Sequence, residues 1–420
     1  MPTIDLQYGR ETISLEIPNS LDVIAAAGEA KRLSDHQIGE LLDNPINTKR
    51  IEEIVSPGET VLFVVPDATR AAAAGQIVNL LVRRLIANGT MPFDIAAIFA
   101  TGIHRAVTEQ EKAEILTPFI AQRVKTLDHS PRDLMQIVNV GELSDGTPVE
   151  LNRALKDFDR VITIGSVGFH YFAGFTGGRK LICPGLASNR TINATHRLAF
   201  DFERRTRAEG VAPGRLEGNP VHEAFVEAAS KVRVDLAVHT MVNSRGELTD
   251  LVCGDLFDSH AATCERFAAT HTREIDEQYE TVIVSCGGSP YDINLIQAHK
   301  ALEAASRACK PGGRIYLLAE CGDGLGRSDL LKWFYAADSK ELADRLAESY
   351  QVNGQTAWSL RTIAERFDVR MVTGLAGDDL ARMGIKKLRP EKLVQEVAEL
   401  KNGCLVRDGS RIYVRPRDQE

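Results

Sequence analysis

Short apolar runs alternate with segments of helical periodicity along most of the chain. Residues 60–65 and 94–99 are apolar almost throughout, a pattern typical of strands buried on both faces of a sheet. Between them, residues 76–86 repeat their apolar positions at the spacing of an amphipathic helix. Residues 160–165 form another strand-like run. Strands that alternate with helices in this way predict an α/β fold with mostly parallel sheets.

The length of the chain predicts more than one domain. A single core stops growing at roughly 250–300 residues, and this chain has 420. The sequence turns polar near residues 270–280, and a new apolar run begins at Thr281. We therefore expect two βαβ-type domains, residues 1–274 and 275–400, with the active site in the cleft between them.

Two further elements are expected in the second half. Asp292 should cap a helix that runs to about residue 310, and residues 314–319 should form the next strand. The tail, residues 401–420, is expected to form a hairpin around Asp408-Gly409 and to pack back on the N-terminal domain.

Composition narrows the class of protein. The net charge is −8, and charges of both signs are interspersed, so we expect no nucleic-acid partner. The seven cysteines form no C-x-x-C pair, which favours reduced thiols in a cytoplasmic protein. No stretch approaches the ~18 apolar residues of a membrane span, and the first residues lack the pattern of a secretory leader. We therefore expect a cytoplasmic protein without membrane contact.

Reactive side chains gather in four loops that follow predicted strands. These loops are residues 66–70, 100–105, 165–197 and 287–292. Because the carboxyl ends of parallel strands meet at one edge of a sheet, we expect side chains from several of these loops to converge on one crevice.

In the first two loops, each candidate has a functional and a structural interpretation. Asp67 either contributes to the site or caps the following helix. The guanidinium of Arg70 suits a carboxylate or phosphate ligand, although a solvated surface arginine is the alternative. His104, together with His170 in the third loop, could exchange protons near neutral pH, whereas either one alone is as easily a structural histidine.

The third loop carries Lys180 after a pair of glycines and His196 a little further on. Lys180 is a candidate phosphate-binding lysine, but the spacing of a phosphate-binding loop is absent because Arg179 precedes it and Leu181 follows it. His196 is a candidate metal ligand, but no other ligand stands near it in sequence, so any metal must bring ligands of its own.

Beyond the fourth loop, Gln297 and Lys300 lie at i and i+3 on the predicted helix and could hold an anion on one face. A solvated helix surface is the alternative for both. His299 lies on another face and is expected to be structural.

Six motifs occur together in the chain. They are Asp67-x-Thr-Arg70, Gly102-x-His-Arg105, His170, Gly-Gly-x-Lys180, Thr-His196-Arg and Asp292-Ile-Asn-Leu-x-Gln297-x-x-Lys300. In this order they resemble the nickel-dependent lactate racemase family, and the resemblance extends from about residue 60 to about residue 330.

The resemblance implies a cofactor. It is the nickel pincer nucleotide, pyridinium-3,5-bisthiocarboxylic acid mononucleotide, covalently attached at Lys180, with His196 as the protein ligand to nickel. Sulfur ligands from such a cofactor suit nickel. The loop Asp67, Ala68, Thr69 and Arg70 is expected to contact the cofactor. Enzymes that make the cofactor become expected partners.

The resemblance also implies a reaction, with residues 1–274 as the cofactor-binding and catalytic domain and residues 275–400 as a Rossmann-like domain. The reaction is inversion of carbon 2 of a 2-hydroxy acid by reversible hydride transfer, with His104 and His170 as the acid/base pair. Arg70, Gln297 and Lys300 are expected to bind the substrate.

The identity of the 2-hydroxy acid is left open by Ile296. The resemblance implies an aromatic residue at this position in lactate-acting members, so a longer 2-hydroxy acid is an alternative to lactate. Two other functions stay open from the residues alone. One is an NAD-dependent 2-hydroxy acid dehydrogenase, although the glycines at 322–326 lack its full spacing. The other is a non-enzymatic protein that binds small carboxylates.

Overall fold

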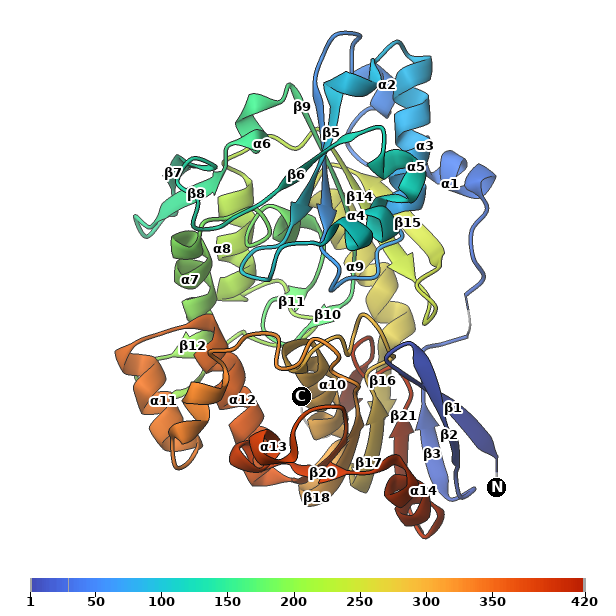
Figure 1. Ribbon diagram of the computed structural model, residues 1–420, viewed down its shortest axis with the longest axis vertical. Helices are drawn as coiled ribbons and strands as arrows, with labels where there is room; N and C mark the ends of the chain where they lie inside the picture. The colour runs from blue at the N-terminus through green and yellow to red at the C-terminus, as the bar shows by residue number, and fades with distance from the viewer. Residues whose placement is uncertain (1, 29, 418–420) are drawn as a thin grey trace. The chain divides into compact units, whose positions relative to one another are not determined.

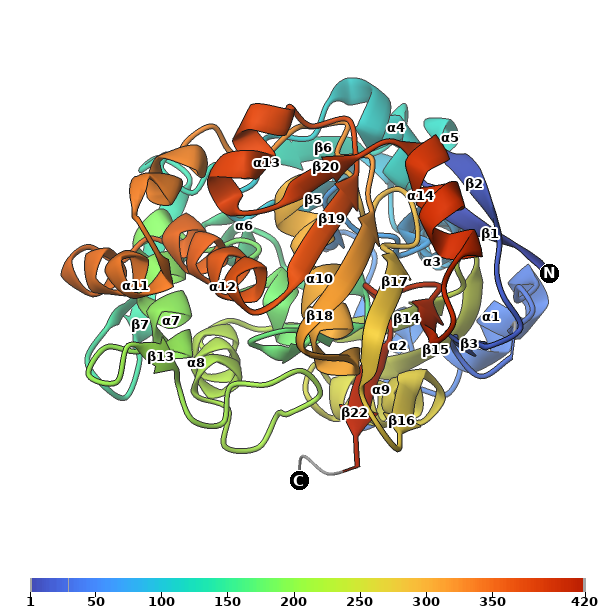
Figure 2. The same ribbon diagram turned by 90° about the horizontal axis from the view of Figure 1, so that it is seen from below.

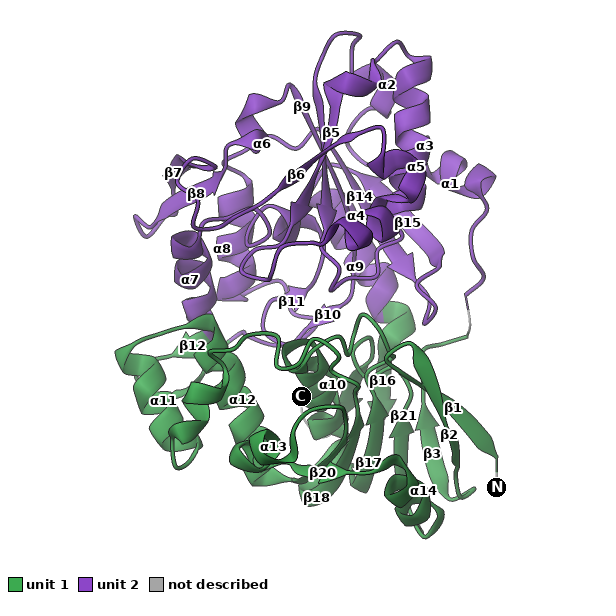
Figure 3. Cartoon of the chain, in the orientation of Figure 1, with its two compact units in different colours: residues 1–28, 200–209, 269–420 green, residues 29–199, 210–268 purple. Residues whose placement is uncertain are grey.

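The computed structural model describes residues 2–28 and 30–417. The chain forms two compact units (Figures 1 and 3). Unit 1 comprises residues 1–28, 200–209 and 269–420, and unit 2 comprises residues 29–199 and 210–268. Each unit is a mixed α/β structure built around one large sheet, as the alternating sequence pattern predicts.

Unit 2 contains a six-stranded sheet of order β15-β14-β9-β4-β5-β6. The strands are β15 (Leu248–Gly254), β14 (Leu236–Val242), β9 (Arg160–Ser166), β4 (Val61–Pro66), β5 (Ile95–Ala100) and β6 (Lys125–Asp128). All neighbours are parallel except β14 and β15. Every residue of β4 is buried, which confirms the interpretation of its apolar run.

Helices and short hairpins complete unit 2. They are α1 (Asp35–Leu42), α2 (Ile51–Ile54), α3 (Ala74–Ala87), η1 (Pro92–Asp94), α4 (Glu109–Leu116), α5 (Pro118–Ala121), β7 (Ile137–Glu142), β8 (Pro148–Asn152), α6 (Ala154–Asp157), β10 (Phe169–His170), β11 (Gly174–Phe175), η2 (Gly178–Leu181), α7 (Asn189–His196), η3 (Arg197–Ala199), α8 (Pro220–Ala229) and α9 (Asp258–His271), whose last residues belong to unit 1. The predicted amphipathic helix is α3, which packs Ile77, Leu81 and Leu85 into the core with the sheet.

Unit 1 contains a second six-stranded sheet, of order β20-β19-β18-β17-β21-β3. The strands are β20 (Lys386–Leu388), β19 (Asp368–Val372), β18 (Cys309–Leu318), β17 (Tyr279–Ser285), β21 (Gly403–Val406) and β3 (Leu21–Ile24). All neighbours in this sheet are parallel. Figure 2 shows β17, β18, β19 and β20 of this sheet from below.

The other elements of unit 1 are helices and small strand pairs. They are β1 (Thr3–Tyr8), β2 (Glu11–Glu16), β12 (Phe200–Asp201), β13 (Thr206–Arg207), β16 (Thr272–Ile275), α10 (Leu295–Ala308), η4 (Leu331–Tyr335), α11 (Ser339–Glu348), α12 (Val352–Arg366), α13 (Gly377–Met383), α14 (Pro390–Ala398) and β22 (Tyr413–Pro416).

The division of the chain differs from the expected boundary between residues 274 and 275. Residues 1–28 belong to unit 1 because β3 pairs in parallel with β21, with Leu21 opposite Gly403. Residues 200–209 also belong to unit 1, where Phe200 joins the apolar core. Both memberships depend on pairings between distant parts of the chain, which local patterning does not reveal.

The hairpin expected around Asp408-Gly409 is wrong. β21 pairs with β17 and β3, whereas β22 pairs in parallel with β16. The turn instead binds the end of β17, since the amide of Gly409 donates to the carbonyl of Ser285 at 2.8 Å. The strands on the two sides of the turn, β21 and β22, therefore do not pair with each other. Their partners lie in unit 1.

The cap expected for the helix after residue 292 is also corrected. α10 starts at Leu295, and its cap is Asn294, whose side chain accepts from the amide of Gln297 at 3.1 Å. Asp292 instead accepts from the amides of Gly9 and Glu320, at 2.7 and 3.1 Å. It therefore ties the β1-β2 turn to the end of β18.

All seven cysteines are buried and none is in a disulfide. This agrees with the reduced thiols expected from their spacing.

Candidate active site

Asp67 and His104 meet because the strands that precede them are neighbours. β4 and β5 run in parallel, with Pro66 opposite Ala100, so the loops that follow leave the same edge of the sheet. His104 Nδ1 lies 2.6 Å from Asp67 Oδ2. The helix that follows begins only at Ala74 and has Ala73 as its cap residue, so the capping interpretation of Asp67 is wrong.

Asp67 is held as a carboxylate. Burial alone would raise its pKa, but the charge and hydrogen bond of His104, the charge of Arg70 and the Thr69 hydroxyl outweigh burial and lower this pKa to about 2. An ionised acceptor requires that His104 donate from Nδ1. The neutral His104 ring therefore has its lone pair at Nε2.

The loop after β4 also positions Arg70. The Thr69 hydroxyl and amide both donate to Asp67 Oδ1, at 2.6 and 3.1 Å. Arg70 Nη1 in turn donates to the Thr69 carbonyl at 2.9 Å and to its hydroxyl oxygen at 2.8 Å. Asp67, Thr69 and Arg70 are thus joined by hydrogen bonds into one cluster beside His104.

His170 lies in the β10-β11 hairpin, where it is opposite Gly174. Its side chain is buried, and its Nδ1 accepts from the amide of Ala173 at 3.3 Å. In this arrangement the neutral ring carries its proton at Nε2. The tautomer of His170 is therefore opposite to that of His104.

His196 ends α7 and presents a lone pair. Its Nδ1 donates to the carbonyl of Ile192 at 2.8 Å, which leaves Nε2 as the acceptor nitrogen. Burial, followed by the charges of Lys180 and His104, lowers the pKa of His196 to about 3. The imidazole is therefore neutral at physiological pH and suited to metal ligation.

The candidates His170, Lys180 and His196 lie around the rings of two phenylalanines. The ring of Phe172 lies 4.4 Å from His170 and 5.3 Å from His196, centroid to centroid. Lys180 Nζ lies 5.4 Å from the centroids of both Phe172 and Phe225, and Phe225 lies 5.3 Å from His196. The structure thus brings His170, Lys180 and His196 to one place in unit 2.

Two glycines allow Lys180 to reach this place. Gly177 and Gly178 have φ values of +74° and +53°, which favour glycine. A Cβ on Gly177 would lie 2.8 Å from the carbonyl oxygen of Ser166, and one on Gly178 would lie 2.6 Å from ring atoms of His260. The turn is therefore close-packed as well as left-handed.

Sequence reasoning missed Arg179 as a structural part of this site. Its side chain is fully buried. Its guanidinium donates to the carbonyl of Ala173 at 2.7 Å and lies 3.1 Å from His260 Nε2. Arg179 thus connects the glycine turn to the hairpin that carries His170. The Gly-Gly-Arg-Lys run contained this residue, but its burial depends on the distant α9.

Phe172 and Phe225 were missed as well. Phe172 stands within the loop that carries His170, so its sequence position offered a signal. Phe225 comes from α8, where only its helical spacing marks it, and that spacing predicts an ordinary core residue.

Gln297 and Lys300 lie on α10 in unit 1. Lys300 Nζ donates to Gln297 Oε1 at 2.6 Å, so the expected i, i+3 proximity is present. His299 is fully buried, and its Nε2 lies 2.9 Å from the Ser359 hydroxyl. The structural interpretation of His299 is therefore confirmed.

Across residues 2–28 and 30–417, no three His, Cys, Asp or Glu side chains are grouped so that they could hold a metal ion by themselves. Within the same residues, no helix has the length and apolar character needed to cross a membrane.

The fold and the clustered imidazoles define an α/β enzyme whose candidate reacting groups are histidines and one lysine. Two family models match the chain. The one described as the lactate racemase N-terminal domain matches residues 8–207, and the one described as the lactate racemase C-terminal domain matches residues 275–395.

Two lactate racemases are similar in sequence. The chain is 28% identical over 349 residues to the protein of Thermoanaerobacterium thermosaccharolyticum, covering 82% of this chain and 80% of that protein. It is 30% identical over 332 residues to that of Lactiplantibacillus plantarum, covering 78% and 76%. The chain belongs to the lactate racemase family and is an isomerase of the racemase class.

Solved structures share the fold. The lactate racemase apoprotein from Thermoanaerobacterium thermosaccharolyticum has a TM-score of 0.84 at 24% identity, over 99% of this chain and 100% of that one. A protein from Thermotoga maritima has a TM-score of 0.73 at 19% identity, over 93% and 100%.

Proposed function

We propose that this enzyme inverts carbon 2 of a short-chain 2-hydroxy acid, with lactate as the first candidate, by reversible hydride transfer. The observation that carries the proposal is the arrangement around Phe172, where His170, Lys180 and His196 lie together. His104 belongs to the same unit, and its charge contributes to the lowered pKa of His196.

The chemistry of the substrate favours hydride over proton removal. The hydrogen on carbon 2 of a hydroxy acid is too weakly acidic for an imidazole unless the carbanion is strongly stabilised. Removal as hydride leaves a planar 2-keto acid, and return of hydride to the other face inverts the centre. Such a step needs an electrophilic cofactor.

The residues present fit a nickel pincer nucleotide. His196 offers a neutral ring with its acceptor nitrogen Nε2, and its Nδ1 is already oriented by Ile192. Among the described residues no group of protein ligands completes a metal site, so a cofactor that supplies its own ligands suits a single histidine. The amine of Lys180, between Phe172 and Phe225, is the proposed attachment point. When bound, this cofactor would supply the hydride acceptor and donor.

His104 is proposed to take the hydroxyl proton at Nε2. The carboxylate of Asp67, 2.6 Å from Nδ1, stabilises the imidazolium that forms. Asp67 thus acts through His104 as a positioning and charge-stabilising residue. Ala68 and Thr69 belong to the same loop and are proposed to contact the cofactor.

His170 is proposed to return a proton to the keto oxygen from Nε2. For this step His170 must begin as an imidazolium, with protons on both ring nitrogens. The 3.3 Å contact from the amide of Ala173 to Nδ1 would then have to open. One turnover moves one proton onto His104 and one off His170, and turnover of the mirror form reverses both.

The substrate carboxylate is assigned to Arg70, because a guanidinium binds a carboxylate with two parallel hydrogen bonds. Gln297 and Lys300 stay predicted substrate ligands. Ile296 leaves the size of the preferred 2-hydroxy acid open, because one methylene in an apolar pocket discriminates by only about 1–3 kcal/mol.

Membership of a racemase family favours inversion over the two alternative functions. An NAD-dependent dehydrogenase would catalyse net oxidation, and a carboxylate-binding protein would catalyse nothing. Neither alternative function requires that Lys180 and His196 both lie against Phe172 and Phe225.

The test uses the full chain, produced in a host that also expresses the cofactor's biosynthetic enzymes. We expect bound nickel, an intact mass increased by the cofactor, and interconversion of D- and L-lactate or a longer 2-hydroxy acid in a chiral assay. Lys180→Ala should lose the mass increase and the activity. Lys156→Ala, which changes an exposed lysine of unit 2, is the matched control. A Lys180→Ala protein with the full mass increase and full activity would overturn the proposal.

A further inference from the structure

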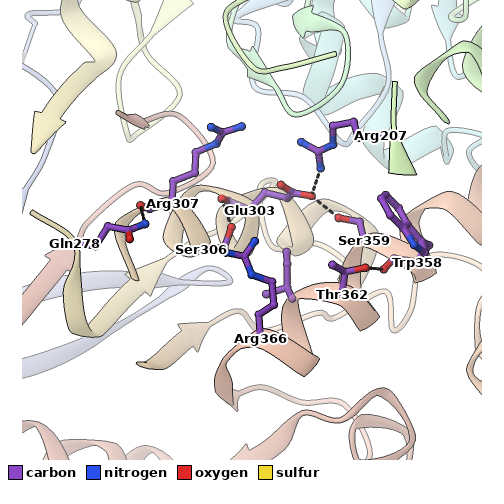
Figure 4. Close-up of a pocket in the computed structure, with 10 residues that line it drawn as sticks. Arg207, Gln278, Glu303, Ser306, Arg307, Trp358, Ser359, Thr362 and Arg366 are labelled. Atoms are coloured by element: carbon purple, nitrogen blue, oxygen red, sulfur yellow. Dashed lines mark hydrogen bonds and ion pairs between the residues drawn. The ribbon is translucent and has the colours of Figure 1, made fainter. Parts of the chain in front are cut away.

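A cavity of about 270 Å³ lies within unit 1, and none of the proposed catalytic, cofactor-binding or substrate-binding residues lines it (Figure 4). Its walls come from β13, from the C-terminal half of α10 and from α12, together with Gln278 just before β17. The charged residues of the lining are Arg207, Glu303, Arg307 and Arg366.

Glu303, the acidic residue of this lining, already has hydrogen-bonded partners. Arg207 Nη2 donates to Glu303 Oε1 at 2.7 Å, and the Ser359 hydroxyl also donates to this carboxylate. The side chain of Glu303 is only 9% exposed. Although burial raises its pKa, the charge of Arg207 and contacts with His299 and Ser359 keep this pKa far below its usual value. Glu303 and Arg207 therefore compensate each other.

The other two arginines have no such compensation. Within residues 2–28 and 30–417, neither Arg307 nor Arg366 forms an ion pair with a carboxylate. The guanidinium carbon of Arg307 lies 5.1 Å from the ring centroid of Tyr413, and that of Arg366 lies 5.2 Å from that of Phe367. Packing against a ring orients a guanidinium while its N–H groups stay in the plane of the group.

Three other polar side chains of the lining already donate hydrogen bonds to backbone carbonyls. The hydroxyls of Ser306 and Thr362 donate to the carbonyls of Glu303 and Trp358 within their own helices, both at 2.8 Å. The Gln278 amide donates to the carbonyl of Arg307 at 2.9 Å. Among the described residues, none accepts a hydrogen bond from the guanidinium of Arg307 or Arg366, and Figure 4 shows both side chains extended.

We propose that this cavity is a binding site for a small multiply charged oxyanion, of the phosphate or polycarboxylate class. Guanidinium groups bind such oxyanions through pairs of parallel hydrogen bonds. The volume lies just below the roughly 300–1,000 Å³ of sites for larger ligands, which suits a compact anion. The site shares no residue with the proposed monocarboxylate substrate site and does not depend on the proposed reaction.

The test measures binding of inorganic phosphate and of citrate to the full chain by isothermal titration calorimetry, at constant ionic strength. Sodium lactate and sodium chloride serve as singly charged comparisons. We expect saturable binding of one anion per chain for phosphate, citrate or both. Binding of phosphate alone identifies the phosphate class, and binding of citrate alone identifies the polycarboxylate class.

Variants assign the binding to this cavity. Arg307→Gln and Arg366→Gln should each weaken it by roughly 10- to 100-fold, the usual loss for a charge-assisted hydrogen bond. Arg204→Gln, which removes an exposed arginine of the same unit, should leave it unchanged. Circular dichroism in anion-free buffer checks folding, and exposed Arg366 provides the variant least able to disturb the core. Absence of saturable binding in the unmodified chain, or undiminished binding in both variants, would overturn the proposal.

Discussion

At the scale of single residues, the carboxylate of Asp67 beside His104 decides how that imidazole can act. The 2.6 Å contact fixes Nδ1 as the donor and so directs proton uptake to Nε2. Amide replacement keeps the shape of the side chain but removes the charge that stabilises the imidazolium.

We predict that Asp67→Asn lowers kcat for racemisation by roughly 10²- to 10⁴-fold, in the range of a lost acid/base function or a lost orienting carboxylate. Nickel content, measured in parallel, separates this loss from a loss of cofactor contacts made by the same loop. Asp157→Asn, at a surface aspartate with a side chain 50% exposed, is the control. Chiral chromatography of product against time measures the rate, and equal rates for the two variants would contradict the role of Asp67.

Much of the residue-scale site was accessible from the sequence. The glycines and strand ends around His104, His170, Lys180 and His196 marked them as candidates, and the structure brings the last three around Phe172. Convergence of the loops that carry Asp67 and His104 was expected, but the hydrogen bond between these two side chains, 37 residues apart, was not. Arg179 was not accessible from the sequence, because its burial against His260 bridges 81 residues.

At the scale of elements, the turn before η2 positions the proposed attachment lysine. Gly178 combines a left-handed φ of +53° with a close approach to His260. Gly146 has a similarly left-handed φ of +81°, but no atom lies within 4 Å of the point that a Cβ would occupy there. Substitution of these two glycines therefore distinguishes the cost of backbone strain from the cost of overpacking.

We predict that Gly178→Ala lowers the free energy of unfolding by roughly 2–4 kcal/mol, from strain plus overpacking. It should also reduce cofactor attachment, since Lys180 follows in the same turn. Gly146→Ala should cost only the strain, about 1–2 kcal/mol. Urea unfolding compares the two variants, and equal destabilisation would show that the contact with His260 costs nothing.

Most elements followed from local pattern, and the failures share one cause. The runs at 60–65 and 94–99 became β4 and β5 because their apolar content suits a strand covered on both faces. The expected hairpin at 403–415 failed because β21 and β22 found parallel partners elsewhere in the chain. A turn sequence specifies a reversal or bend, but it does not specify which strand becomes the neighbour.

At the scale of the whole molecule, buried neutral histidines make stability depend on pH. Burial lowers the pKa of His129 to about 4 and that of His239 to about 3, and it lowers the pKa of His260 well below its ordinary value. All three belong to unit 2. The unfolded chain takes up these protons near pH 6.5, whereas the folded chain does so only at lower pH.

We therefore predict that stability is fully present above about pH 6.5 and falls as the pH drops toward 4. Each of these histidines contributes up to about 1.4 kcal/mol per pH unit in this window. Urea unfolding midpoints between pH 7.5 and pH 4.5 measure the slope. His129→Gln should reduce it, while His36→Gln, at a side chain 82% exposed, should not. A midpoint that stays constant over this range would contradict the prediction.

The sequence by itself determined the α/β class, the strands and helices with strong periodicity, and the glycine-rich segment that carries Lys180 and His196. These features depend on neighbours within a few residues, where apolar spacing and backbone freedom act directly. Only the tertiary structure decided that β3 joins the sheet beside β21 and that Asp67 binds His104 rather than capping a helix. It likewise decided that Arg307 and Arg366 line one cavity. These choices depend on chain closure and on burial between distant segments, and local sequence contains neither.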